Sequence, residues 1–233
     1  MPARGKFIVL EGIDGSGKRT QLEMLAQAFA SRGVPFAQIS FPCYDGFFGK
    51  LVARYLNGEF GPLEAVDAHF SALLYAGDRV EAKLKIEADL SSGRMLLADR
   101  YIGSNLAHQG ARVAIAERAE FLRWLKQLEY QVYGLPAEDL VLYLHVPPAV
   151  AHWLVGEKGA REYTKLRRDI QESNLAHLQA ASDVYDQLAR EPNWQKIECY
   201  DTEVNALRSP EAIHQDVLAA VDARIAISQR VEK

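Results

Sequence analysis

A glycine-rich segment near the amino end constrains the fold of this chain more than any other feature. The apolar run at residues 6–10 (KFIVL) leads into residues 12–18 (GIDGSGK), which match the pattern GxxxxGK, and an amphipathic stretch follows at residues 19–32. Strand, glycine-rich loop and helix in this order form a P-loop, in which backbone N–H groups and the positive end of the helix surround phosphate oxygens. The alternative is a glycine-rich turn without a ligand, which the flanking strand and helix disfavour.

The P-loop interpretation assigns a continuous stretch of residues to nucleotide phosphates. They are Gly12, Ile13, Asp14, Gly15, Ser16, Gly17, Lys18, Arg19 and Thr20. Lys18 can reach the β- and γ-phosphates, but Arg19 stands where a Mg²⁺-ligating Ser or Thr is usual. Arg19 is therefore expected to place charge on the transferring phosphoryl group, with Mg²⁺ held through water and by carboxylates. Asp99 follows the apolar run at residues 95–98 and is a candidate ligand, although a helix N-cap is the alternative role.

Further apolar runs alternate with helical patterns along the chain. Strands are also predicted at residues 36–41, 95–98, 140–146 and 194–200, and helices at residues 47–56, 63–90, 118–133 and 168–190 and from residue 210 onward. Strands this apolar are buried on both faces, and parallel strands need crossover connections. We therefore expect a single α/β domain over residues 1–233, a three-layer α/β/α fold with a five-stranded parallel sheet.

The charge and cysteine content exclude several classes of protein. Of the 233 residues, 48% are apolar, and 27 Lys and Arg stand against 31 Asp and Glu, a net charge of −4. This chain lacks the positive field of a nucleic-acid or anionic-membrane binder, so neither partner is expected. No apolar run approaches the roughly 20 residues of a membrane helix, which favours a cytoplasmic protein. Cys43 and Cys199 stand alone, which argues against disulfides and cysteine-based zinc sites.

Glycines and charges gather late in the sequence. Residues 156–165 (GEKGAREYTK) interrupt two helical patterns and favour a mobile flap, or lid, over residues 156–168. Its cations Arg161, Lys165, Arg167 and Arg168 could meet phosphate charge, although a solvated helix face is the plainer interpretation. A short P-loop chain with such a flap and without the NKxD motif of guanine-specific proteins is typical of a nucleoside monophosphate kinase.

Six sequence elements then carry a family resemblance over nearly the whole chain. They are EGIDGSGKRTQ at residues 11–21, FPCY at 41–44, YAGDR at 75–79, DRYIGSNLAHQG at 99–110, YGLP at 133–136 and RRDIQE at 167–172. Together they resemble the thymidylate kinase family, in particular a bacterial type with GKRT in the P-loop. The resemblance implies a P-loop kinase fold and transfer of the ATP γ-phosphoryl group to thymidine monophosphate (dTMP), giving dTDP and ADP.

The resemblance also implies the residues of a dTMP site. Asp14 would position the sugar 3′-hydroxyl or a water on Mg²⁺, and Tyr44 and Arg100 would face the acceptor phosphate. Tyr75 would stack on thymine and Arg79 would hydrogen-bond its O4. The remaining predicted dTMP-binding residues are Phe41, Ser104, which shapes the wall, and Asn105, which reads the other polar edge of thymine. His108 completes the site where the family usually has a tyrosine near the sugar, so it affects selectivity for the 2′-deoxy sugar; without the motif it would be read as a structural histidine.

Because the acceptor phosphate is already anionic, alignment and charge neutralisation are expected to do most of the catalysis. The residues assigned to catalysis are Lys18, Arg19, Arg100, Asp14 and the lid arginine Arg161, and those assigned to Mg²⁺ are Asp14, Asp99 and Glu172. Two alternatives remain: a kinase of another pyrimidine monophosphate such as UMP, and a catalytically silent nucleotide-binding protein. The resemblance further implies a homodimer formed through helices at residues 63–90 or 121–133.

Overall fold

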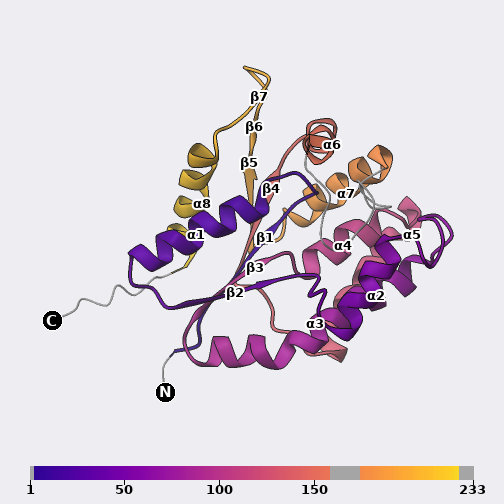
Figure 1. The fold of residues 1–233 in the computed structure, drawn as a ribbon, viewed down its shortest axis with the longest axis horizontal. Coiled ribbons are helices and arrows are strands. Elements are labelled where there is room, and N and C mark those ends of the chain that lie inside the picture. The colour runs from indigo at the N-terminus through magenta and orange to yellow at the C-terminus, as the bar shows by residue number, and fades with distance from the viewer. Residues whose placement is uncertain (1–2, 158–173, 226–233) are drawn as a thin grey trace.

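The centre of the molecule is a parallel sheet of five strands. The computed structural model describes residues 3–157 and 174–225. The strands are β1 (Phe7–Glu11), β2 (Phe36–Ser40), β3 (Met95–Asp99), β4 (Leu140–His145) and β5 (Trp194–Glu198), in the spatial order β2-β3-β1-β4-β5 (Figure 1). All four pairings are parallel, with Val9 opposite Ala98 on one side and Val141 on the other. The predicted five-stranded parallel sheet is confirmed.

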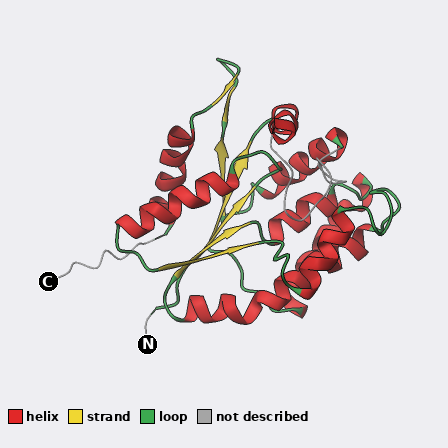
Figure 2. Cartoon of the chain, in the orientation of Figure 1, coloured by secondary structure: helices red, strands yellow, loops and turns green. Residues whose placement is uncertain are grey.

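Helices cover both faces of this sheet, as the α/β/α prediction requires (Figure 2). One layer contains α1 (Lys18–Ser31) and α8 (Pro210–Arg224), which contact each other and the sheet. The other side holds α2 (Phe47–Leu56), α3 (Ala68–Ser91), α4 (Ile102–Gly110), α5 (Ile115–Lys126), α6 (Pro148–Glu157) and α7 (Leu175–Leu188). A π-helical segment, η1 (Gln127–Val132), continues α5, and a two-stranded hairpin, β6 (Tyr200–Asp201) and β7 (Ala206–Leu207), precedes α8.

The apolar core follows from the strands that lie between two helical layers. All five residues of β1 are buried, as are the first four of β3 and the first five of β4. A carboxylate, Glu11, is therefore placed at the buried end of the central strand. The edge strand β2 is more exposed and has only Ile39 buried. The polar ends of β1, β2 and β3 lie at the same edge of the sheet, because the three strands run in the same direction.

Several predicted boundaries are wrong for identifiable reasons. The helix predicted at residues 63–90 begins at Ala68, because the carboxylate of Asp67 caps it by accepting from the N–H groups of His69 and Phe70. The helix predicted at residues 118–133 is α5 followed by η1. The short helix α4 and the β6–β7 hairpin were not predicted at all, and the last sheet strand ends at Glu198 rather than at residue 200.

The late segments are only partly within the described structure. Of the helix predicted at residues 168–190, the described part is α7. The predicted lid lies outside the described residues except for its first two positions, which end α6. Among the residues that the structure describes, no helix is both long and apolar enough to span a membrane.

Candidate functional site

The P-loop sits directly after the central strand, where Gly12, Gly15 and Gly17 all adopt positive φ. At Gly15, with φ +89°, a Cβ atom would lie 2.6 Å from the carbonyl oxygen of Ala151, so only glycine fits this turn. Gly17, at φ +86°, starts α1, which places the positive end of that helix at the loop. The sequence-predicted phosphate loop is thus present with the geometry that phosphate binding needs.

Lys18 is held across the loop. Its Nζ donates to the carbonyl oxygens of Gly12 and Ile13, each at 3.0 Å, and the side chain is buried. Burial, with a smaller contribution from the nearby positive charge of Arg100, lowers the pKa of Lys18 from 10.5 to about 8. A phosphate group at this position would supply the negative charge that the buried ammonium lacks.

Two oxygen atoms beside the loop are buried without a hydrogen-bond partner. They are Oγ of Ser16 and Oδ1 of Asp99 at the end of β3. Oxygen donors of this kind suit Mg²⁺, which keeps several waters and binds through one or two carboxylates plus phosphates. Among the described residues no group of three or more His, Cys, Asp or Glu side chains could hold a metal on its own. The described donors therefore fit Mg²⁺ only as part of a shell completed by a nucleotide and water.

The two residues after Lys18 are exposed to solvent rather than buried at the loop. The side chain of Arg19 is 87% exposed and pairs with Glu23 one turn along α1, with Nε and Oε1 2.9 Å apart. Thr20 is also exposed. The structure therefore does not bring Arg19 into the buried cluster that contains Lys18, and its predicted catalytic role stays a prediction.

Arg100 joins the phosphate loop to the rest of the site. It adopts φ +67°, unusual for a residue with a side chain, directly after β3. Its Nη1 donates to the carbonyl oxygen of Gly12 at 3.1 Å and to Oγ of Ser104 at 2.9 Å, and its Nη2 donates to Asp14 at 2.7 Å. One guanidinium thus connects the P-loop with helix α4.

Glu11 was not predicted as a site residue, yet it holds this junction. Its buried carboxylate accepts from the backbone N–H groups of Tyr101 and Ser104, at 2.8 and 2.9 Å, and so caps the start of α4 from the neighbouring strand. It also accepts from the hydroxyls of Ser104 and Tyr185, at 2.6 and 2.9 Å. The only sequence signal was a carboxylate at the end of an otherwise apolar strand.

A cavity opens beside the P-loop on the α4 side. It is lined by Asp14, Phe41, Pro42, Tyr44, Leu56, Tyr75, Arg79, Arg100, Tyr101, Ser104, Asn105, His108 and Gln109. Every residue that the sequence predicted for the dTMP site is in this set. Asp14 and Arg100 border both the cavity and the phosphate loop, so a ligand in the cavity would meet a nucleotide held by the loop.

At one end of the cavity three polar side chains are bonded together away from solvent. Arg79 on α3 is 2% exposed, and its Nε and Nη2 donate to the two oxygens of Glu129, at 2.5 and 2.6 Å. Glu129 is fully buried on η1 and also accepts from Nδ2 of Asn105 at 2.8 Å. Glu129 was not predicted as a site residue. It stands in a helical pattern, and nothing in the sequence indicates which long-range partner a single glutamate contacts.

His108 meets a second histidine behind the cavity. Its Nδ1 lies 3.5 Å from Nε2 of His177 on α7. Burial lowers the pKa of His177 to about 4 and the pKa of His108 well below its usual value, with the positive charge of Arg100 contributing to the latter. Both rings are therefore neutral at pH 7, and Nε2 of His108 is buried without a hydrogen-bond partner.

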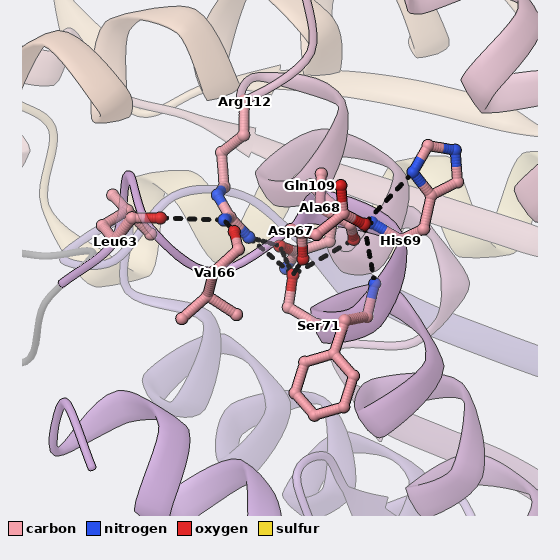
Figure 3. Close-up of polar contacts among 9 residues, drawn as sticks. Leu63, Val66, Asp67, Ala68, His69, Ser71, Gln109 and Arg112 are labelled. Atoms are coloured by element: carbon pink, nitrogen blue, oxygen red, sulfur yellow. Dashed lines mark hydrogen bonds and ion pairs between the residues drawn. The ribbon is translucent and has the colours of Figure 1, made fainter. Parts of the chain in front are cut away.

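Arg112, just beyond α4, bonds to several residues around the start of α3 (Figure 3). Its Nη2 donates to the carbonyl oxygens of Leu63, at 2.8 Å, and Val66, which fastens the loop before α3. Its Nη1 donates to Oγ of Ser71 at 2.5 Å and to the cavity-lining Gln109 at 2.9 Å. The same guanidinium thus ties a loop to the cavity wall, although no motif singled it out.

Some of the predicted site residues lie outside the described residues. They are the lid cations Arg161, Lys165, Arg167 and Arg168 and the predicted metal ligand Glu172. The roles predicted for Arg161 in catalysis and Glu172 at the metal stay predictions.

Comparison with known proteins gives one consistent picture. The family model described as "Thymidylate kinase" matches residues 10–217. A thymidylate kinase of Mycobacterium tuberculosis is 33% identical over 78% of this chain and 85% of its own, and the human thymidylate kinase is 32% identical over 92% and 88%. A probable thymidylate kinase of Pyrococcus horikoshii is 36% identical over 94% and 96%. Among solved structures, thymidylate kinase from Candida albicans matches 96% of this chain and 93% of its own, with a TM-score of 0.73 and 20% identity.

Proposed function

The chain belongs to the thymidylate kinase family, and from this premise we propose that it transfers the γ-phosphoryl group of ATP to dTMP, producing dTDP and ADP. The observation that carries the proposal is the shared wall of the two sites: Asp14 and Arg100 border both the P-loop and the cavity. A donor on the loop and an acceptor in the cavity would therefore approach each other. Neither the UMP kinase nor the catalytically silent protein is favoured by these matches.

Charge placement supports the catalytic roles. Lys18 and Arg100 both donate to the carbonyl oxygen of Gly12, so the two cations lie close together at the loop. Phosphoryl transfer spreads negative charge over the transferred group, and cations already fixed by hydrogen bonds stabilise it without reorganising. Asp14 holds one side of the Arg100 guanidinium at 2.7 Å, which fixes the direction in which that cation faces.

Mg²⁺ is part of the proposal. Bound Mg²⁺ would supply positive charge that offsets the negative charge of the ATP phosphates. Asp99 would hold it, directly or through water, because its Oδ1 is buried and unpartnered beside Lys18. Asp14 already pairs with Arg100, so we assign it to orienting that arginine first and to a metal-bound water second.

The cavity also supports a pyrimidine nucleotide as acceptor. Its aromatic residues Phe41, Tyr44 and Tyr75 offer faces for stacking a base, and the ring of Tyr75 is held by an edge-to-face contact with Tyr55 at 6.3 Å between centroids. Arg79 and Asn105 line the cavity from α3 and α4, and Asp14 and Arg100 line it beside the phosphate loop. A nucleoside monophosphate would fill this cavity with its base at Arg79 and Asn105 and its phosphate toward Arg100.

We include a homodimer in the proposal, and α3 is the favoured surface. Phe70, Leu73, Val80 and Leu84 lie on one face of this helix, and all four are exposed, Leu84 to 80%. A stripe of large apolar side chains on one helix suits a self-complementary contact between two copies. A cytoplasmic location is also part of the proposal, because ATP is supplied there.

Release of ADP with dTMP, dUMP, UMP and dCMP as acceptors, with and without Mg²⁺, tests this function. We expect dTMP to give the highest kcat/KM and omission of Mg²⁺ to abolish turnover. A preference for UMP would overturn the substrate, and absence of turnover with every acceptor would overturn the enzyme assignment.

A further inference from the structure

The polar end of the cavity has a defined hydrogen-bonding polarity. Nδ2 of Asn105 donates to the carbonyl oxygen of Ala72 at 3.1 Å and to Glu129 at 2.8 Å, and both of these partners can only accept. The amide must therefore turn its NH₂ group toward them. Its Oδ1, which is buried without a partner, remains as an acceptor in the cavity wall.

The neighbouring arginine has the complementary polarity. Nε and Nη2 of Arg79 are both used by Glu129, and Nη1 makes no hydrogen bond to any described residue. The cavity wall thus offers a donor from Arg79 and an acceptor from Asn105. Thymine and uracil present a carbonyl next to a ring N–H, which matches this pair, whereas cytosine presents an amino group next to an unprotonated nitrogen and opposes it twice.

We propose that Glu129 is the positioning residue that sets this base preference, because its one carboxylate fixes both Arg79 and Asn105. The inference rests on the proposed function, in which the cavity takes a nucleoside monophosphate. Glu129 lies outside the cavity lining and reaches the ligand only through these two side chains. Its place on the π-helical segment η1 agrees with the frequent occurrence of such segments at functional sites.

Replacing the carboxylate by an amide should reverse part of this polarity. In Glu129→Gln one oxygen becomes an NH₂ group, which cannot accept from Asn105 or Arg79. Oε1 of Glu129 accepts from both Asn105 and Nη2 of Arg79, and Oε2 accepts from Nε of Arg79. If the NH₂ replaces Oε1, Nη2 of Arg79 loses its acceptor and the Asn105 amide must turn its oxygen toward the NH₂ and its own NH₂ into the cavity. If the NH₂ replaces Oε2, Nε of Arg79 loses its acceptor. Either way, the wall no longer presents a fixed donor beside a fixed acceptor.

The experiment measures kcat/KM for dTMP, dUMP and dCMP in the wild-type protein and in Glu129→Gln. We expect the dTMP to dCMP ratio to fall roughly tenfold or more, since buried polar groups that match one base carry the discrimination. The dTMP to dUMP ratio should stay unchanged, because both bases present the same edge. The change should appear in the KM for the acceptor while the KM for ATP stays constant.

A matched control is Glu138→Gln. Glu138 is also a buried carboxylate, but it accepts from Tyr130 at 2.7 Å and touches neither Arg79 nor Asn105. This variant should keep both ratios. If Glu129→Gln does not fold, Glu129→Asp retains the charge but withdraws the carboxylate by one methylene, and it should lower the dTMP to dCMP ratio as well.

An unchanged dTMP to dCMP ratio in a folded Glu129 variant would overturn this inference and leave the kinase function intact. A wild-type protein that phosphorylates none of the three acceptors would instead overturn the proposed function. Equal loss of activity with all three acceptors would reduce Glu129 to a structural role and reject the inference too.

Discussion

Replacing Arg112 by methionine tests how a single guanidinium holds the loop at residues 61–67 against the cavity wall. Methionine keeps the length and apolar stem of the side chain but removes every donor. Ser71 and Gln109 would still bond each other at 2.8 Å. The Tyr55 hydroxyl, which accepts from Arg112 at 3.1 Å, can still rotate to donate elsewhere. The groups left without a donor are therefore the carbonyl oxygens of Leu63 and Val66. Both residues are largely buried, at 6% exposure.

The expected loss follows from those two carbonyl oxygens. An unsatisfied buried acceptor costs roughly 1–3 kcal/mol, and partial access of water to the loop favours the lower half, which gives about 3 kcal/mol in total. For a domain of this size that corresponds to a fall in Tm of roughly 6–12 °C. Because Gln109 lines the cavity, the KM for dTMP should rise while kcat changes less.

Urea unfolding followed by circular dichroism, together with a thermal melt, gives the free energy of unfolding. Arg54→Met is the matched control, because Arg54 is exposed and pairs with Glu59 at 2.7 Å, a contact worth at most about 1 kcal/mol. If Arg112→Met costs no more than Arg54→Met, the two loop carbonyls do not depend on the guanidinium and the reasoning fails.

Three further predictions follow from single side chains. Lys18→Ala should lower kcat roughly 10²–10³-fold with little loss of stability. In the wild-type protein, kcat/KM for ATP should fall as the pH rises through about 8, where Lys18 loses its charge. A pH profile that stays flat to pH 9.5 would contradict the assignment of Lys18 to phosphate binding. Burial raises the pKa of Glu138 from 4.5 to about 7. Between these two pH values the folded protein keeps Glu138 protonated while the unfolded chain does not, so the free energy of unfolding falls as the pH rises from 4.5 to 7. Urea unfolding of Glu138→Gln should therefore show a gain over wild type that grows by roughly 2–3 kcal/mol from pH 5 to pH 8, and a pH-independent difference would refute it. Leu84→Glu should convert a dimer to a monomer in light scattering, whereas Leu207→Glu, an exposed position on β7, should not; a wild-type monomer would reject the dimer.

The sheet could be predicted from the sequence because its strands are buried on both faces. Residues of β1, β3 and β4 read as short continuous apolar runs, and the glycines of the P-loop mark where the first strand must end. The residues of the cavity were found by family resemblance, and the structure brings them together. Residue type alone could not have done this, since Phe41, Tyr75 and Asn105 come from separate segments.

Helix α4 shows where local patterns fail. Eight of its nine residues are buried, so it has no solvent-exposed face, and its polar residues Asn105, His108 and Gln109 line the cavity instead of meeting solvent. Its start has no side-chain cap of its own, because the cap is Glu11, which is 90 residues from Tyr101 in the sequence. A helix stabilised in this way becomes visible only when the sheet has placed β1 beside it.

Glu11 and Glu129 are both buried carboxylates with partners far away in the sequence, which explains why the sequence did not reveal their roles. A carboxylate taken out of water is costly unless several donors satisfy it. Each is fully buried, and each accepts from donors on segments that form the phosphate loop junction or the cavity wall. The cost of leaving either carboxylate unpaired therefore restricts the rotamers of Ser104, Arg79 and Asn105. Rigid placement of these cavity-lining side chains thus depends on two acidic residues that do not themselves line the cavity, in a chain whose acidic net charge gave no indication of their role.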